Sequence, residues 1–248
     1  MGMLLNQNIS LANIATGVIL PVSDGLQYFN LFNDGSQLGR NFASGKPAAT
    51  VVGSPAVNTE NITVTNLGNY INTNVAQGQE MTIITIGKPT AASGNFVHWS
   101  NYGSAITNGG SGLTSTDFAR ASVSTGNPSI SLSYSDDNFA TRKTLTYGVS
   151  SGADTVKLRA IASVFSQSGM TSRIRDLTNA KVASNAIPAG GVLSVAGTIL
   201  LGSHYTNVEG STGNLYAGMI FNRALSDSEI DTLYTSLKSY YSGKGISV

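Results

Sequence analysis

Short apolar runs separated by clusters of Gly, Asn and Ser fill this sequence from Leu26 to Phe221, with no helical period between them. Runs of this length, bounded by turn residues, are typical of β-strands. Strands that follow one another closely without intervening helices pair into antiparallel sheets, and each sheet must bury one apolar face against another layer. The pattern therefore predicts an all-β chain built as an antiparallel β-sandwich.

The expected strands differ in how they bury their two faces. The segment at 81–86 is apolar almost throughout, which predicts a strand covered on both sides. The segment at 155–161 alternates, so Lys157 and Arg159 are expected on a solvent-exposed face. The segments expected to form strands are 27–32, 50–52, 61–65, 70–73, 81–87, 96–100, 118–123, 129–134, 143–149, 155–161, 170–176, 182–184, 197–201 and 215–221.

An amphipathic helix is predicted after the last of these strands. Ser226 can serve as the N-cap, and Glu229 follows three residues later, so the two side chains complete a capping box. Gly243 is expected to end the helix in a left-handed conformation. One apolar face is formed by Ile230, Leu233, Tyr234, Leu237, Tyr240 and Tyr241.

The charge of the chain argues against nucleic acid as a partner. Charged residues make up 11% of the sequence, and 14 basic against 13 acidic side chains leave a net charge of +1 with no basic run. Nucleic-acid phosphates need a concentrated basic surface, which this sequence does not supply. The chain also has no cysteine, so neither a disulfide framework nor a thiolate metal site can form.

The N-terminal region is expected to contain neither a signal peptide nor a membrane span. Residues 1–6 lack the charged region and long apolar run of a secretory signal. The stretch at 11–22 is short and interrupted by Asn13, Gly17 and Pro21, so no membrane insertion is expected.

Three parts of the chain are expected from these patterns. Residues 1–25 are interpreted as an extended arm, which either adds an edge strand to the same domain or docks on another subunit. The β-sandwich follows at 26–225, and the helix at 226–248 is expected to pack on it.

The carboxylates and histidines do not form a recognisable catalytic set. Glycoside hydrolysis needs two carboxylates on opposite sides of the scissile bond. The neighbours Asp136 and Asp137 lie in a turn, where a turn role is favoured and calcium binding through their oxygens is the alternative. His98 and His204 each lack a second histidine at ligand spacing. We therefore expect no enzymatic activity, and no cofactor apart from that calcium ion.

Aromatic residues beside polar ones are the best candidates for a binding site. Trp99, Tyr102 and Tyr205 could stack on sugar rings, and Asn207 could pair with sugar hydroxyls. Trp99 also fits the core of one sheet, which is the favoured interpretation for this single tryptophan.

A second candidate for binding is the pair Arg173 and Arg175. Two arginines on one face of a strand could bind an acidic sugar, although a cross-strand ion pair or a subunit contact is favoured.

The end of the chain resembles a known family. Between Gly213 and Tyr234, a strand runs into Asn-Arg-Ala-Leu-Ser-Asp-Ser-Glu-Ile and then a helix rich in Leu and Tyr. This arrangement is similar to the closing element of concanavalin A-like, laminin-G-like lectin domains, and the segments at 69–73 and 81–86 extend the likeness. The segment at 41–55 is similar to part of the lectin-like virion proteins of tailed bacteriophages.

The resemblance implies a jelly-roll β-sandwich whose concave face usually meets the ligand, and a rim where some members bind calcium. It further implies a non-enzymatic structural protein of the phage virion, associated with the tail or baseplate, that binds host-surface carbohydrate as a receptor. Its partners would be other virion proteins and further copies of itself, with a trimer favoured. It would be made in the host cytoplasm and reside in the virion. The alternatives are a capsid decoration or assembly protein that makes only protein contacts and, third, a carbohydrate-active enzyme.

Overall fold

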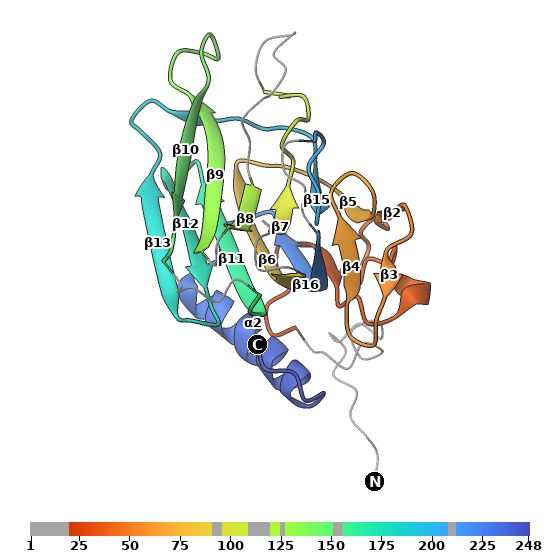
Figure 1. Cartoon of the computed structure of the whole chain (residues 1–248). Helices are drawn as coiled ribbons and strands as arrows, with labels where there is room; N and C mark the ends of the chain where they lie inside the picture. Colours follow the sequence, from red (N-terminus) through yellow and green to blue (C-terminus); the bar gives the residue numbers. More distant parts are fainter. Residues whose placement is uncertain (1–19, 91–95, 109–119, 125–126, 151–155, 208–211) are drawn as a thin grey trace.

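Two antiparallel sheets face each other in the computed structural model of the chain (Figure 1). The structure describes residues 20–90, 96–108, 120–124, 127–150, 156–207 and 212–248, with the side chains of 120–124 left out. The first sheet has the order β13 (Lys181–Ala186), β12 (Thr171–Asp176), β11 (Arg159–Ser166), β6 (Glu80–Pro89), β16 (Thr212–Phe221), β4 (Ile62–Thr65) and β3 (Ala56–Val57), with β1 (Leu26–Asn30) also paired to β16. The second has the order β10 (Lys143–Gly148), β9 (Asn127–Ser135), β8 (Arg120–Ser124), β7 (Phe96–Ser100), β15 (Thr198–Leu201), β5 (Tyr70–Ala76) and β2 (Thr50–Val52), with β14 (Val192–Leu193) paired to β9.

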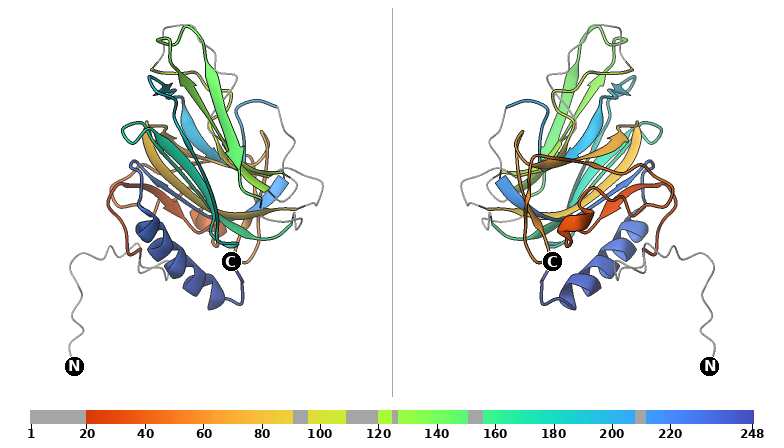
Figure 2. Two further views of the ribbon diagram at one scale, coloured as in Figure 1. Left: turned by 90° about the vertical axis from the view of Figure 1, so that its left-hand side faces the viewer. Right: turned by 90° about the vertical axis from the view of Figure 1, so that its right-hand side faces the viewer.

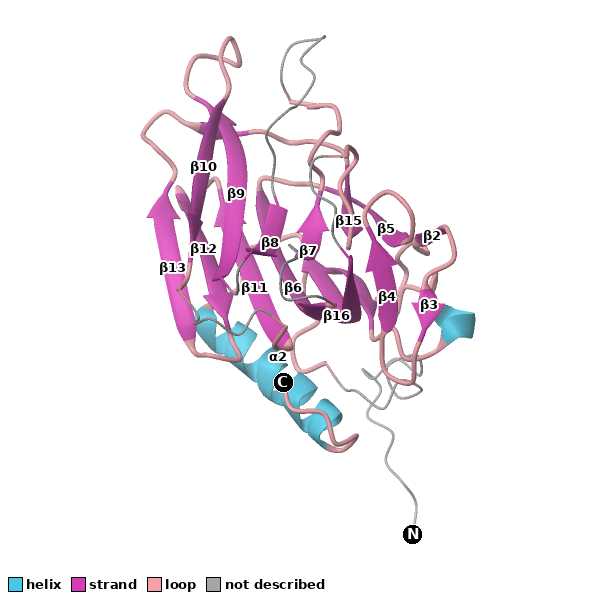
Figure 3. Ribbon diagram, in the orientation of Figure 1, coloured by secondary structure: helices cyan, strands magenta, loops and turns pink. Residues whose placement is uncertain are grey.

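The predicted all-β architecture with antiparallel sheets and a C-terminal helix is confirmed (Figure 3). A short 3-10 helix, η1 (Gly35–Gln37), and the two-residue strands β3 and β14 were not predicted. Of the strand expected at 118–123, positions 118 and 119 lie outside the described residues, and β8 continues to Ser124.

Two apolar layers hold the molecule together, one on each side of the first sheet. Met81 and Ile83 of β6 belong to the layer between the sheets, whereas Ile84 and Ile86 belong to the layer beneath the helix. All four side chains are at most 1% exposed, so the prediction of a strand buried on both faces is confirmed. Alternate residues of a strand point to opposite faces, which explains how one apolar run supplies both layers.

The helix α2 (Asp227–Ser242) lies across the outer face of the first sheet (Figure 2). Its buried residues are Ile230, Leu233, Leu237 and Tyr241, and they pack in the same apolar layer as Ile84 and Ile86. The Tyr241 hydroxyl donates a hydrogen bond to the Tyr216 carbonyl at 2.8 Å, which ties the end of the helix to β16. No helix of the described residues has the length and apolar character needed to span a bilayer.

The predicted capping box is present at the start of this helix. The Glu229 amide donates to the Ser226 hydroxyl at 3.3 Å, and the Ser226 amide donates to the Glu229 carboxylate at 2.8 Å. The helix ends at Gly243 as predicted, but the predicted left-handed conformation of this residue is wrong, because Gly243 is right-handed with φ −60°. The left-handed residue is Gly245, with φ +75°, and the Ile246 amide beyond it donates to the Tyr241 carbonyl at 2.9 Å.

The prediction of a solvent-exposed face at 155–161 is also wrong. The strand β11 begins only at Arg159, whose side chain is fully buried and forms an ion pair with the buried Asp176 at 3.2 Å. The carboxylate of Asp176 also accepts hydrogen bonds from the amide and the side chain of Asn179. The alternating pattern failed here because a buried arginine needs a charged partner from another strand, and no local pattern reveals that partner.

The N-terminal arm lies largely outside the described residues, which begin at position 20. Leu20 packs in the apolar layer beneath the helix. Asp24 forms an ion pair with Arg223 at 3.1 Å, so the start of the described chain lies against the corner between β16 and α2.

Candidate functional site

Two loops meet on the second sheet, one after β7 and one after β15. The chain turns back at Gly202, which has φ +82°, and the Tyr205 amide then donates to the Tyr102 carbonyl at 2.8 Å. A Cβ atom at Gly103 would lie 2.5 Å from Cγ2 of Thr206, so only glycine allows this approach. The structure therefore brings together Tyr102 and Tyr205, which the sequence had singled out on different segments.

Tyr205 presents its ring from a fixed position. Its side chain is 36% exposed, and its hydroxyl lies 2.6 Å from the Thr198 hydroxyl and donates to the Thr198 carbonyl at 3.1 Å. A ring that is held at its polar tip and partly exposed is suited to stacking, because little conformational entropy remains to be lost on binding.

The two other loop residues contribute less apolar surface. Tyr102 is half-buried, and its ring packs edge-on against that of His204 at 5.4 Å between centroids. Asn207 is exposed two residues beyond Tyr205. His204 is buried, with Nδ1 at 2.8 Å from the Ser100 hydroxyl, which supports its predicted structural role.

Trp99 does not belong to this surface. Its side chain is fully buried between the sheets, and its indole N–H donates to the Ser163 hydroxyl at 3.1 Å. The ring lies 6.3 Å from that of Phe165. Trp99 is therefore a core residue, as favoured above, and its assignment as a carbohydrate-binding residue is corrected.

A row of hydrogen bonds leads away from Tyr205 across β15, β5 and β2. The Thr198 hydroxyl, which contacts Tyr205, donates to Oδ1 of Asn72 at 2.8 Å. The same oxygen accepts from the Asn74 amide at 3.0 Å, and Nδ2 of Asn74 donates to the Thr50 hydroxyl at 3.1 Å. We call these residues, Thr50, Asn72, Asn74, Thr198 and Tyr205, the polar row.

A bulge in β5 gives the polar row its shape. Thr198 lies opposite Ala76, and Leu200 lies opposite Asn72. Between these two pairs, β5 therefore has two more residues than β15. Asn74 sits in this bulge with φ +58°, a left-handed conformation that asparagine tolerates better than most residues. Sequence reasoning missed the row, although the alternation of polar Asn72 and Asn74 with buried Ile71 and Thr73 was a usable signal.

Comparisons with known proteins define the fold. No family model matches the sequence, and no curated protein matches it. The botulinum neurotoxin serotype D binding domain is similar with a TM-score of 0.61, 15% identity, and coverage of 86% of this chain and 52% of that one. The receptor-binding domain of the botulinum neurotoxin C/D mosaic serotype has a TM-score of 0.61 at 16% identity, over 86% of this chain and 52% of that one.

This chain has a lectin-like β-sandwich fold. A third similar structure is the serotype D ligand-binding domain in complex with N-acetylneuraminic acid, with a TM-score of 0.60, 16% identity, and coverage of 86% of this chain and 51% of that one. The chain thus spans about half the length of the binding domains that it resembles.

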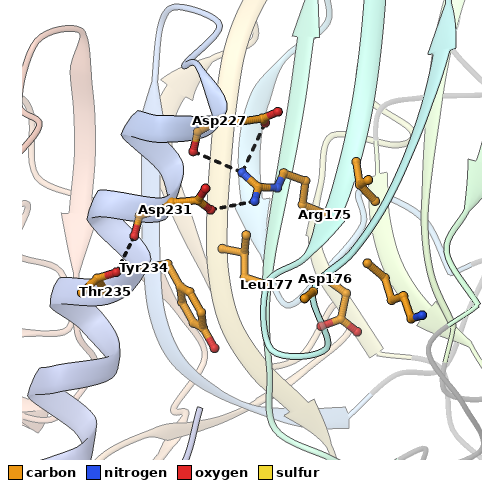
Figure 4. A pocket seen from close by; sticks show the side chains of 10 residues that line it. Arg175, Asp176, Leu177, Asp227, Asp231, Tyr234 and Thr235 are labelled. Carbon is orange, nitrogen blue, oxygen red and sulfur yellow. Dashed lines mark hydrogen bonds and ion pairs between the residues drawn. The ribbon is translucent and has the colours of Figure 1, made fainter.

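On the other side of the lectin-like sandwich, a groove of about 370 Å³ separates α2 from the edge of the first sheet (Figure 4). Arg175 forms ion pairs there with Asp227 at 3.2 Å and Asp231 at 2.6 Å, and Arg173 lies 3.4 Å from Asp227. The arginines thus join the sheet to the helix. An ion pair was favoured, but its partner is the helix rather than a neighbouring strand, and the acidic-sugar role for this pair is not supported.

Both carboxylates in the turn between β9 and β10 are bound to neighbouring residues in or beside that turn. Asp137 accepts hydrogen bonds from the Ser135 hydroxyl at 2.7 Å and the Thr141 amide at 2.9 Å, and also from the Thr141 hydroxyl. Hydrogen bonds from Thr141 and Ser135 lower the pKa of Asp137 to about 2. Asp136 forms an ion pair with Lys143 at 2.7 Å. This geometry is that of a turn, and calcium binding at Asp136 and Asp137 stays a prediction.

Buried polar groups lie between the sheets of the lectin-like sandwich. Nδ1 of His98 is 2.9 Å from the Thr85 hydroxyl, and burial, reinforced by the charge of Arg159, lowers the pKa of His98 to about 3. Within the described part of the chain, no group of three or more His, Cys, Asp or Glu residues is arranged to hold a metal ion. His98 therefore remains neutral and structural at physiological pH.

Proposed function

We propose that this chain is a non-enzymatic, carbohydrate-binding β-sandwich of a tailed-phage virion, associated with the tail or baseplate and reading host-surface glycan. The observation that carries the binding role is Tyr205, an exposed ring pinned by its hydroxyl beside Tyr102 and Asn207. Sugar rings stack on such faces while amides pair with their hydroxyls.

Two further observations support parts of this proposal. One of the similar binding domains was solved in complex with N-acetylneuraminic acid, so a fold of this kind carries a sugar in at least one protein. The virion role rests on the sequence resemblance at 41–55, and with it the partnership with other virion proteins and the virion location.

The test is binding of the labelled chain to a panel of intact bacterial strains, with and without enzymatic removal of surface polysaccharide. We expect binding to susceptible strains that disappears with the polysaccharide. Tyr205→Ala should weaken it about tenfold or more, because central aromatic contacts dominate such interfaces. Tyr205→Phe retains the ring but loses the hydroxyl that holds it, so it should bind less tightly than the parent and more tightly than Tyr205→Ala. Binding that survives both polysaccharide removal and Tyr205→Ala would contradict the proposal.

A second candidate is an assembly role based on protein contacts alone. The strand β13 carries Val182, which is 61% exposed, and it forms one of the two edges of the first sheet. Exposed edge strands can pair with a strand of another chain. Binding to particles that lack this protein, without any binding to cells, would favour this second role.

A further inference from the structure

A surface cavity of about 490 Å³ adjoins the polar row at Asn74. Asn74 is both a member of the row and part of the cavity lining. The other polar side chains in the lining belong to Gln27, Lys46 and Asn222. The cavity and the tyrosine are therefore parts of one continuous surface, connected through hydrogen-bonded side chains.

The charge of this cavity is positive. Among the described residues that line it, Lys46 alone is charged, and none is acidic. Lys46 is exposed, and it takes part in none of the ion pairs found within the described residues. Its ammonium group is thus available to an anionic ligand, whose charge no neighbouring carboxylate in the lining would repel.

The amides of the cavity can recognise hydroxyl groups. Nδ2 of Asn74 donates its two hydrogens to the Ala48 carbonyl at 2.8 Å and the Thr50 hydroxyl at 3.1 Å, which fixes the side chain, so its Oδ1 is the atom that can accept a hydrogen bond from a ligand hydroxyl. Asn222 is exposed at the end of β16. A fixed amide and an exposed one beside a cation, without aromatic residues in the lining, suit a polar ring that bears a negative charge.

The length of the surface determines the size of the ligand. From Tyr205 the row passes through Thr198 of β15 and Asn72 of β5 to Asn74, which lines the cavity. A ligand that contacts both the ring of Tyr205 and the cavity must cross β15 and β5, which lie about 4.8 Å apart, so we expect an oligosaccharide rather than a single sugar.

We propose that this surface binds an anionic oligosaccharide, with a carboxylate- or phosphate-bearing sugar at Lys46 and a neutral sugar on the ring of Tyr205. The inference rests on the proposed function and adds the substrate class and a second subsite to it. Lys46 supplies charge recognition, Asn74 and Asn222 supply hydrogen bonds, and Tyr205 supplies stacking.

The experiment is a glycan array probed with the full chain at low and high salt. The array carries uronic-acid, sialic-acid and phosphate-bearing oligosaccharides, each beside a neutral copy made by carboxyl reduction or dephosphorylation. We expect binding to acidic oligosaccharides that falls about tenfold on neutralisation and weakens as salt is raised. Binding of the uronic-acid or sialic-acid oligosaccharides would indicate a carboxylate at Lys46, and binding of the phosphate-bearing ones would indicate a phosphate.

Two variants locate the charge recognition. Lys46→Glu should lower affinity for acidic glycans about tenfold, whereas Lys46→Arg keeps the charge and should bind within a few-fold of the parent.

A third variant tests the hydrogen bond from the cavity. Asn74→Gly keeps the left-handed backbone but removes the amide, and it should weaken binding several-fold. Circular dichroism and melting temperature check that each variant is folded.

The outcomes separate the inference from the proposed function. If Lys46→Glu binds like the parent, or if neutral copies bind as well as acidic ones, the anionic subsite is overturned. Loss on Tyr205→Ala in that same experiment would still uphold carbohydrate binding. If the folded parent chain binds no glycan on the array, both the inference and the proposed function are overturned.

Discussion

His98 lies uncharged between the two sheets, where burial and, to a smaller extent, the charge of Arg159 lower its pKa to about 3 against the opposing charge of Asp176. The unfolded chain has a histidine pKa near 6.5. Between these two pKa values, His98 binds a proton in the unfolded chain but not in the folded protein. Because the unfolded chain binds the extra proton, the free energy of unfolding is highest with respect to His98 above about pH 6.5, and it decreases as pH falls towards 3.

We predict that His98→Asn flattens this pH dependence, because its side chain cannot take up a proton. Urea unfolding of the parent and the variant at pH 7, 5.5 and 4 measures the effect. The parent should lose more free energy of unfolding than the variant over this range. Equal losses in the two proteins would show that other groups account for the acid sensitivity.

At the scale of elements, the capping box determines how firmly α2 is held. We predict that Ser226→Ala destabilises the protein by about 1 kcal/mol, because the Glu229 amide loses its acceptor. Ser226→Asp, which keeps an acceptor at the N-cap, should lose much less. Thermal unfolding of the three proteins tests this, and an unchanged melting temperature for Ser226→Ala would contradict it.

Local patterns predicted the elements well and their long-range partners poorly. The helix start at Ser226 and the doubly buried β6 depend on residues close in sequence, so both could be predicted. The burial of Arg159 depends on Asp176 in another strand. The polar row likewise needs Tyr205, Thr198 and Asn72 to meet through folding. Tyr205 could be named as a candidate, but neither its fixed hydroxyl nor the cavity at Lys46 could be read from the chain.

At the scale of the whole molecule, the resemblance predicts a homotrimer. We expect a particle of three times the chain mass of 25.7 kDa in sedimentation equilibrium. The measurement should be repeated over a range of concentrations, because weak self-association through the exposed edge of β13 would dissociate on dilution. A species of 25.7 kDa at every concentration would contradict the trimer.

The position of β16 in the first sheet has a consequence for synthesis. This strand lies between β6 and β4, yet every other strand of the sheet precedes it in the chain. While the ribosome is still translating up to residue 211, the nascent chain can form two separate sheet fragments but cannot join them. The outer apolar face of the first sheet, which α2 covers, then stays exposed until β16 and α2 emerge together. The first sheet can therefore be completed only after Thr212–Phe221 has been made, and a nascent chain stalled before Thr212 would expose apolar surface that favours aggregation.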